Sequence, residues 1–369
     1  MNKPKAPAIP IYIPSLDGNE REYVNRCLDS TWISSKGEFI EQFESEFARY
    51  TGIGHATGVC NGTVALHLAL AALGIGPGDE VIVPTLTYIA SVNTIVQIGA
   101  TPVLVDSLEN TWQVDPEDIV RKITPRTRAV MVVHLYGHPC DMDPIVALCA
   151  DRGLYLIEDC AEAFGSRYHG KHVGTFGDAA TFSFFGNKTI TTGEGGMVAC
   201  RSEQLHRRCA HLKNQGAASY KQYWHDELGY NYRMTNICAA IGLAQLERAD
   251  EIIRAKREIA ARYREGLKGL PLVVHGEFGD VVHSYWMTSI LLDQPNRRDL
   301  LSEHLDEVGI ETRPVFYPVH TMPMYSGLSQ VHPVAKSIAS RGINLPSWPK
   351  LREEQVAQVC EEITRFLAE

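Results

Sequence analysis

The sequence lacks the features that mark secreted and membrane proteins. Its nine cysteines are an odd, scattered set without a C-x-x-C pair, which favours reduced thiols over a disulfide framework. No apolar run approaches the length of a transmembrane helix, and the opening segment MNKPKAPAIPIYIPSLDG holds no apolar core long enough for a signal peptide. We therefore expect a cytoplasmic protein with no membrane partner.

Positive charge is also scarce. The chain has 35 lysines and arginines against 44 aspartates and glutamates, which gives a formal net charge of −9. This balance argues against a general nucleic-acid surface, so we expect no nucleic-acid partner. An anionic substrate would need a local cluster of cations to overcome the overall field.

Motifs for two common cofactor classes are missing. The glycine-rich segments GIGHATG and GIGPGD do not match G-x-G-x-x-G between a strand and a helix, which disfavours a nicotinamide cofactor. In HLYGHPCDM, the close spacing of His134, His138 and Cys140 is like part of a zinc site. No second ligand cluster completes it, so we interpret this segment as a strand-end loop and expect no metal.

What the chain does have is a regular alternation of strands and helices. Apolar segments such as EVIVP, TPVLVD, AVMVV and LYLIED alternate with helical ones, which predicts an α/β fold with a mostly parallel sheet covered on both faces. A long helical pattern, from about Thr235 to Leu267, leads into a smaller α+β part. At 369 residues the chain is too long for one small core, and we place a large domain at 1–250 and a small C-terminal domain at 251–369.

Ligands bind such sheets at the carboxyl ends of the strands, and three polar features fall there. In CNGTVALHLAL, the amides of Gly62 and Thr63 open a helix and can bind a phosphate, although the turn alone favours a plain Asn61 cap. In LYLIEDCA, Asp159 ends an apolar strand, where a surface acid is the alternative. In TFSFFGNKTITTGEGGM, Lys188 lies between an aromatic strand end and a loop rich in threonine and glycine, where an ordinary surface lysine is the alternative.

The three features together suit Schiff-base chemistry. Desolvation and nearby charge lower the pKa of an amine, so that neutral nucleophile exists at working pH. Pyridoxal phosphate needs a lysine for its aldehyde, an acid for its pyridinium nitrogen and an anion pocket for its phosphate. Each feature alone is weak evidence, but their combination at strand ends indicates this cofactor.

Several motifs resemble those of the DegT/DnrJ/EryC1/StrS nucleotide-sugar aminotransferases, which have the aspartate-aminotransferase-like fold type I and use pyridoxal 5'-phosphate. The similarity extends over nearly the whole chain. It rests on the segments STWISSKG, NGTVALHLAL, GDEVIVPTLTYIASVN, ATPVLVD, HLYGHPCDMDPI, IEDCAEAFGS, GDAATFSFFGNKTITTGEGGM, GYNYRMTNICAAIGLAQLE and RPVFYPVHTMPMY.

The resemblance implies roles for the three strand-end features. Lys188 would bond covalently to the cofactor aldehyde and shuttle a proton, and Asp159 would pair with the pyridinium nitrogen. The amides of Gly62 and Thr63 and the hydroxyl of Ser183 would hold the phosphate.

The resemblance also implies contacts from other segments. Tyr88 would stack on the cofactor ring, and Glu162, at a position that is often glutamine in this group, would lie by the 3-hydroxyl. Asn231 would reach the cofactor phosphate from the neighbouring subunit, which makes a homodimer with a shared active site. Expected substrate contacts are Arg313, Tyr317 and His320.

The activity implied by the resemblance is amino transfer from L-glutamate to GDP-4-keto-6-deoxy-D-mannose, giving GDP-perosamine for a surface polysaccharide such as an O-antigen. A related 3-dehydratase carries histidine at the lysine position, so Lys188 favours transfer over dehydration. One alternative keeps the mechanism but uses a UDP- or dTDP-linked 4-keto-6-deoxy sugar. A second is an aminotransferase-like protein that senses a ligand without catalysis.

Overall fold

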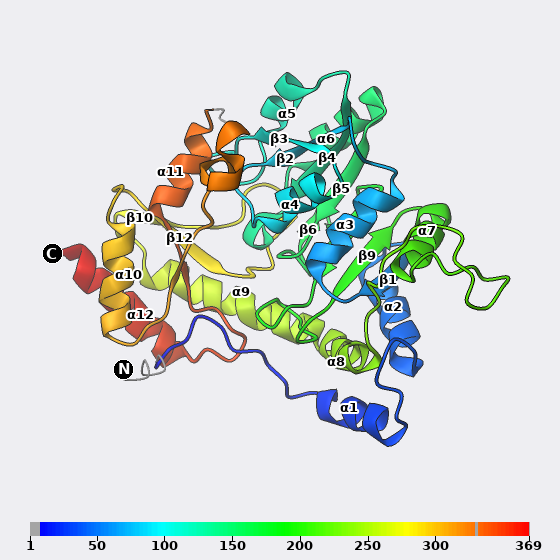
Figure 1. Cartoon of the computed structure of the whole chain (residues 1–369). Helices are drawn as coiled ribbons and strands as arrows, with labels where there is room; N and C mark the ends of the chain where they lie inside the picture. Colours follow the sequence, from blue (N-terminus) through cyan, green and yellow to red (C-terminus); the bar gives the residue numbers. More distant parts are fainter. Residues whose placement is uncertain (1–7, 329–330, 369) are drawn as a thin grey trace.

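The computed structural model describes residues 8–328 and 331–368, and a seven-stranded sheet forms its centre (Figure 1). The strand order is β1-β9-β8-β5-β4-β2-β3. β9 runs antiparallel to both of its neighbours, whereas the other paired strands are parallel. This confirms the predicted mixed, mostly parallel α/β sheet. The strands are β1 (His55–Val59), β2 (Glu80–Pro84), β3 (Thr101–Val105), β4 (Thr127–Val133), β5 (Tyr155–Asp159), β8 (Ala179–Ser183) and β9 (Gly196–Cys200).

Helices cover both faces of the sheet. Successive strand residues point to opposite sides, and apolar side chains on both sides need to be buried. In β2, Val81 and Val83 enter the hydrophobic core on one face, while Ile82 enters the core on the other. The first face carries α3 (Gly62–Ala72), α4 (Ala90–Gln97) and α7 (Glu203–Lys213). The second carries α2 (Glu38–Thr51), α5 (Pro116–Lys122), α6 (Met142–Arg152) and α8 (Asn236–Glu247), with α1 (Glu20–Asp29) against α8.

A second, antiparallel sheet lies in the C-terminal part, in the order β10-β12-β14-β13. Its core includes Ile290 and Ile343 from the sheet, together with Tyr263 and Ile363 from two helices. The elements of this part are α9 (Ala249–Gly266), β10 (Leu272–Val274), β11 (Val281–Val282), β12 (Thr288–Leu292), α10 (Arg298–Glu307), β13 (Arg313–Pro314), α11 (Pro333–Arg341), β14 (Gly342–Leu345) and α12 (Glu353–Ala368), with 3-10 turns η2 (Val319–Thr321) and η3 (Pro323–Leu328).

The helical pattern from about Thr235 to Leu267 predicts one long helix, and this prediction is wrong in detail. The segment forms two successive helices, α8 and α9, because Arg248 leaves the helical conformation with φ −110° and ψ 12°. The Arg248 side chain at this break pairs with Glu251 at 2.8 Å. Figure 1 shows α9 running from α8 toward the C-terminal elements, so this pair of helices joins the two sheets.

Two further contacts join residues before position 250 to residues after it, one of them within a third, three-stranded sheet in the order β11-β6-β7. Ile9, near the N-terminus, bridges Ile310 and belongs to the C-terminal core. β11 pairs with β6 (Arg167–Tyr168), which also pairs with β7 (Lys171–His172). Because these contacts cross the predicted domain boundary near residue 250, that boundary stays a prediction. Among the described residues, no helix is long and apolar enough to cross a membrane.

Candidate active site

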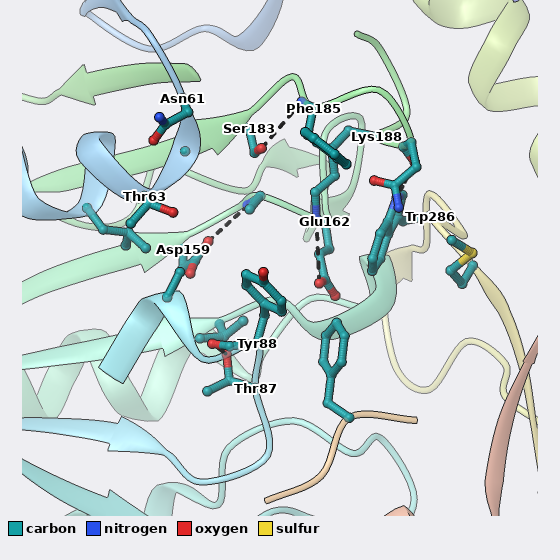
Figure 2. Close-up of a pocket in the computed structure, with 18 of the residues that line it drawn as sticks. Asn61, Thr63, Thr87, Tyr88, Asp159, Glu162, Ser183, Phe185, Lys188 and Trp286 are labelled. Carbon is teal, nitrogen blue, oxygen red and sulfur yellow. Dashed lines mark hydrogen bonds and ion pairs between the residues drawn. The ribbon is translucent and has the colours of Figure 1, made fainter. Parts of the chain in front are cut away.

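A cavity of about 590 Å³ lies where the carboxyl ends of the central strands meet residues of the second sheet. It brings together all the predicted cofactor residues except Asn231, and it also contains Arg313. Figure 2 shows Lys188, Glu162, Asp159, Tyr88 and Ser183 around this space. Adjacent parallel strands bring these side chains together because their carboxyl ends share one edge of the sheet. The lining residues from the prediction are Gly62, Thr63, Tyr88, Asp159, Glu162, Ser183, Lys188 and Arg313.

The N-terminus of α3 forms one wall of the cavity. Asn61 caps this helix, since its side-chain oxygen accepts the main-chain N–H of Val64 at 2.9 Å. A Cβ atom on Gly62 would lie 2.7 Å from the Cβ of Ser183, so only glycine lets the helix start approach this serine so closely. The cap and the anion site are therefore compatible: the amides of Gly62 and Thr63 and the Ser183 hydroxyl line one concave corner, which fits a phosphate.

Lys188 is mostly buried between an acid and an aromatic ring. Its Nζ lies 3.6 Å from Oε1 of Glu162 and 3.8 Å from the ring centre of Trp286. Burial lowers the pKa of Lys188, although Glu162 and Asp159 oppose the change. Burial likewise raises the pKa of Glu162 to about 7, against the attraction of Lys188. This lysine is not an ordinary surface residue: burial favours its neutral form, while the carboxylates beside it favour the charged form.

The loop that carries Lys188 is held at its main chain by two distant aromatic residues. The Tyr12 hydroxyl donates to the carbonyl oxygen of Lys188 at 2.6 Å. The Trp286 indole N–H donates to the carbonyl oxygen of Asn187 at 2.7 Å. Sequence reasoning missed both residues, because each lies far along the chain from Lys188 and neither belongs to a strand-end motif.

Asp159 ends β5 and points into the same cavity. Its two carboxylate oxygens accept the main-chain N–H of Ala161 at 3.0 Å and the Ser91 hydroxyl at 2.8 Å. Burial raises the pKa of Asp159, while these hydrogen bonds and Lys188 act in the opposite direction. A cationic ring N–H beside this carboxylate would favour its ionised form, so the residue fits a pyridinium nitrogen.

Glu158, the neighbouring acid, faces away from the cavity and is fully buried. It accepts main-chain N–H groups of Gly174, Phe176 and Gly177 at 2.6–2.8 Å. His134 accepts the Cys140 N–H on Nδ1, so its Nε2 donates to Glu158 at 3.1 Å. His134, Glu158 and Cys160 offer ligand atoms within 4.8 Å of one another, but these hydrogen bonds explain the cluster without an ion.

The predicted substrate residues divide between two locations. Arg313, in β13, lines the cavity. Tyr317 points elsewhere, and its hydroxyl accepts from Arg298 at 3.2 Å, while buried His320 lies 2.7 Å from the Thr85 hydroxyl. Phe316 lines the cavity instead, with its ring 5.6 Å from that of Tyr88. Its position next to Tyr317 in RPVFYP was the only available signal for it.

Asn231 lies outside the cavity of its own chain. Its side-chain oxygen accepts from the Arg233 guanidinium at 2.7 Å, and its main chain bridges Asn214. The segment before it exposes apolar and aromatic side chains: Tyr220, Tyr223, Trp224 and Leu228. Figure 1 shows this segment after α7 projecting from the body of the chain.

Comparison with known proteins points to one family. Residues 14–364 match the DegT/DnrJ/EryC1/StrS aminotransferase family. GDP-perosamine synthase of Escherichia coli O157:H7 is 63% identical over 98% of this chain and 99% of its own length. GDP-perosamine synthase of Vibrio cholerae is 58% identical over 97% and 99% of the two chains. The Streptococcus pneumoniae protein Spr1654, solved in its PLP form, superposes with a TM-score of 0.92 at 28% identity, covering 98% of each chain.

Proposed function

Because this chain belongs to the DegT/DnrJ/EryC1/StrS family of pyridoxal-phosphate-dependent sugar aminotransferases, we propose that it makes GDP-perosamine. The reaction moves an amino group from L-glutamate to C4 of GDP-4-keto-6-deoxy-D-mannose. The observation that carries the proposal is the convergence of Lys188, Asp159 and the α3 N-terminus in one cavity. The names of the two relatives, which cover nearly the whole chain, supply the product, GDP-perosamine.

Each strand-end feature has a task in this proposal. The bound cofactor supplies an electron sink for making and breaking bonds at the carbon next to the amine nitrogen. Asp159 would keep the ring nitrogen protonated, and Gly62, Thr63 and Ser183 would hold the phosphate. Nζ of Lys188 would abstract a proton and then deliver one to C4 of the sugar, and burial, which lowers the pKa of Lys188, favours the neutral form needed for the abstraction. A histidine at position 188 would lack the primary amine that bonds the aldehyde.

The cavity walls suit a sugar nucleotide. Arg313 supplies a cation at the mouth of the cavity, and its side chain is 53% exposed. This local positive charge stands against the acidic balance of the whole chain. Tyr88 would stack on the cofactor ring, and Phe185 and Phe316 add aromatic surface that a sugar or base can contact. Of the three predicted substrate residues, only Arg313 belongs to this lining, so we assign the cationic substrate contact to Arg313.

We further propose a cytoplasmic homodimer in which Asn231 of one subunit completes the phosphate site of the other. The exposed aromatic segment before Asn231 supports a contact with a second chain. Mixing inactive Lys188→Ala and Asn231→Ala dimers tests this arrangement, because half of the sites in a mixed dimer combine two intact residues. Random reassortment should restore about a quarter of wild-type activity. No recovery after verified subunit exchange would contradict a shared site.

The test of the activity uses ¹⁵N-labelled L-glutamate. Purified protein loaded with pyridoxal phosphate is given GDP-4-keto-6-deoxy-D-mannose, and mass spectrometry follows the label into the sugar nucleotide. UDP- and dTDP-linked 4-keto-6-deoxy sugars are run in parallel. We expect label in the GDP product at the highest kcat/KM. Equal or higher values for the UDP or dTDP sugar would favour the alternative substrates, and binding without any label transfer would favour a ligand sensor.

A further inference from the structure

Tyr136 has a strained backbone directly behind the cavity wall. It follows β4 in the 3-10 turn η1 (Leu135–Gly137), with φ 56° and ψ 7°, and its side chain is completely buried. Bulky residues seldom adopt this left-handed conformation, which persists only where surrounding contacts enforce it. Such strain clusters at functional sites, and the contacts of Tyr136 show what it holds in place.

The main chain of Tyr136 holds the acid beside Lys188. Its N–H donates to Oε2 of Glu162 at 2.9 Å. The other oxygen of the same carboxylate lies 3.6 Å from Nζ of Lys188. The hydrogen bond therefore fixes the carboxylate in the orientation that faces the lysine.

The side chain of Tyr136 holds the aromatic wall on the other side of the lysine. Its ring is nearly parallel to that of Trp286, at 7° and 6.0 Å, and it stacks on Phe316 at 5.3 Å. Its hydroxyl accepts the main-chain N–H of Phe316 at 2.9 Å. Trp286 in turn lies 3.8 Å from Nζ of Lys188. One buried residue thus positions both groups that contact the amine, and it joins the central sheet to segments around the second sheet.

We propose that Tyr136 is a positioning residue that sets the proton affinity of Lys188 by fixing Glu162 and Trp286 on either side of it. The inference rests on the proposed role of Lys188. A carboxylate and an aromatic face both favour the protonated form of a nearby nitrogen. Loosening them should therefore lower the pH at which the Lys188 nitrogen loses its proton. The other charged groups lining the cavity are Asp159, Glu194 and Arg313, which Tyr136 does not hold by any hydrogen bond in the described structure.

The test is Tyr136→Leu, which removes the ring that packs against Trp286 and Phe316 and the hydroxyl that Phe316 contacts, but keeps the backbone N–H that Glu162 accepts. The absorbance of cofactor bound to Lys188 is followed against pH, since it reports the protonation of the lysine nitrogen. We expect the midpoint to fall by about half a unit or more. We also expect kcat to fall about tenfold with KM nearly unchanged, because the proton-transfer geometry is loosened.

The matched control is Tyr263→Leu. Tyr263 is also fully buried, and its hydroxyl donates to the carbonyl oxygen of Pro346 at 3.0 Å, within the C-terminal core. This control should lose thermal stability to a similar degree without moving the midpoint. Equal midpoints and equal kcat for Tyr136→Leu and wild type would overturn the inference.

Two further outcomes separate this inference from the proposed function. A wild-type protein that takes up no cofactor would contradict the proposed function itself. If the wild type titrates and a Tyr136→Leu variant titrates identically, only the positioning role is contradicted. If Tyr136→Leu does not fold, Trp286→Phe replaces it. This change reduces the aromatic face beside Nζ of Lys188 and removes the indole bond to Asn187, so it should lower the midpoint in the same direction. An unmoved midpoint in that variant would also overturn the inference.

Discussion

Replacing Glu162 with glutamine tests how strongly a buried carboxylate acts on Lys188. Glutamine keeps the shape and an oxygen that can accept the Tyr136 N–H, but it removes the negative charge. At the observed 3.6 Å, two unit charges attract by about 4–5 kcal/mol at an effective dielectric constant near 20. Because burial raises the pKa of Glu162 to about 7, the carboxyl is only partly ionised at neutral pH.

The net effect should therefore be smaller than the full attraction. We expect the pKa of Lys188 to fall by about 1–3 units in Glu162→Gln, which corresponds to about 1.4–4 kcal/mol. The assay is the rate at which cofactor-free protein captures pyridoxal phosphate, measured against pH, because only the neutral amine attacks the aldehyde. The inflection of this profile gives the pKa of Lys188.

A matched control removes a carboxylate far from the cavity. Glu258 is exposed on α9, and Glu258→Gln should reproduce the wild-type profile. An inflection for Glu162→Gln that is unchanged, or that lies at higher pH than wild type, would refute the reasoning about this ion pair.

Two further changes follow from particular contacts. Gly62→Ala places a Cβ 2.7 Å from the Cβ of Ser183, so it should close the phosphate corner and weaken cofactor binding by about tenfold or more. An unaltered dissociation constant for the cofactor would contradict this. Burial lowers the pKa of His138 to about 4 and of His275 to about 3, below about 6.5 in the unfolded chain. The unfolded state then binds more protons below pH 6.5, so each histidine should cost about 3 kcal/mol of stability by pH 4. Denaturant unfolding between pH 7 and pH 4.5 checks this, and the slope should be smaller in His275→Gln; identical slopes would contradict it.

The central sheet and the cofactor corner were predictable because their signals are local. Apolar strands end at Asp159 and Ser183, and a helix begins at Gly62, so the rule that parallel strands share one ligand-binding edge brings these positions together. Glu162 also reaches the cavity, although it lies in a turn after β5 and not in a helix.

The other side of the cavity was not predictable from local patterns. Trp286 and Tyr12 approach Lys188 from remote segments, and their spacing in the sequence carries no sign of that contact. In RPVFYP, sequence reasoning favoured the polar Tyr317, but backbone geometry turns Phe316 toward the cavity. The left-handed conformation of Tyr136 follows from tertiary contacts and has no signature in HLYG.

The central claim is that Lys188 carries the cofactor of an amino-transferring enzyme. Reduction of the loaded protein with borohydride fixes the cofactor to its lysine, and peptide mass spectrometry then locates it. We predict the added mass on the peptide that contains Lys188, and its loss when L-glutamate is added before the reductant. Label on another lysine, or label on Lys188 that glutamate leaves untouched, would contradict the claim.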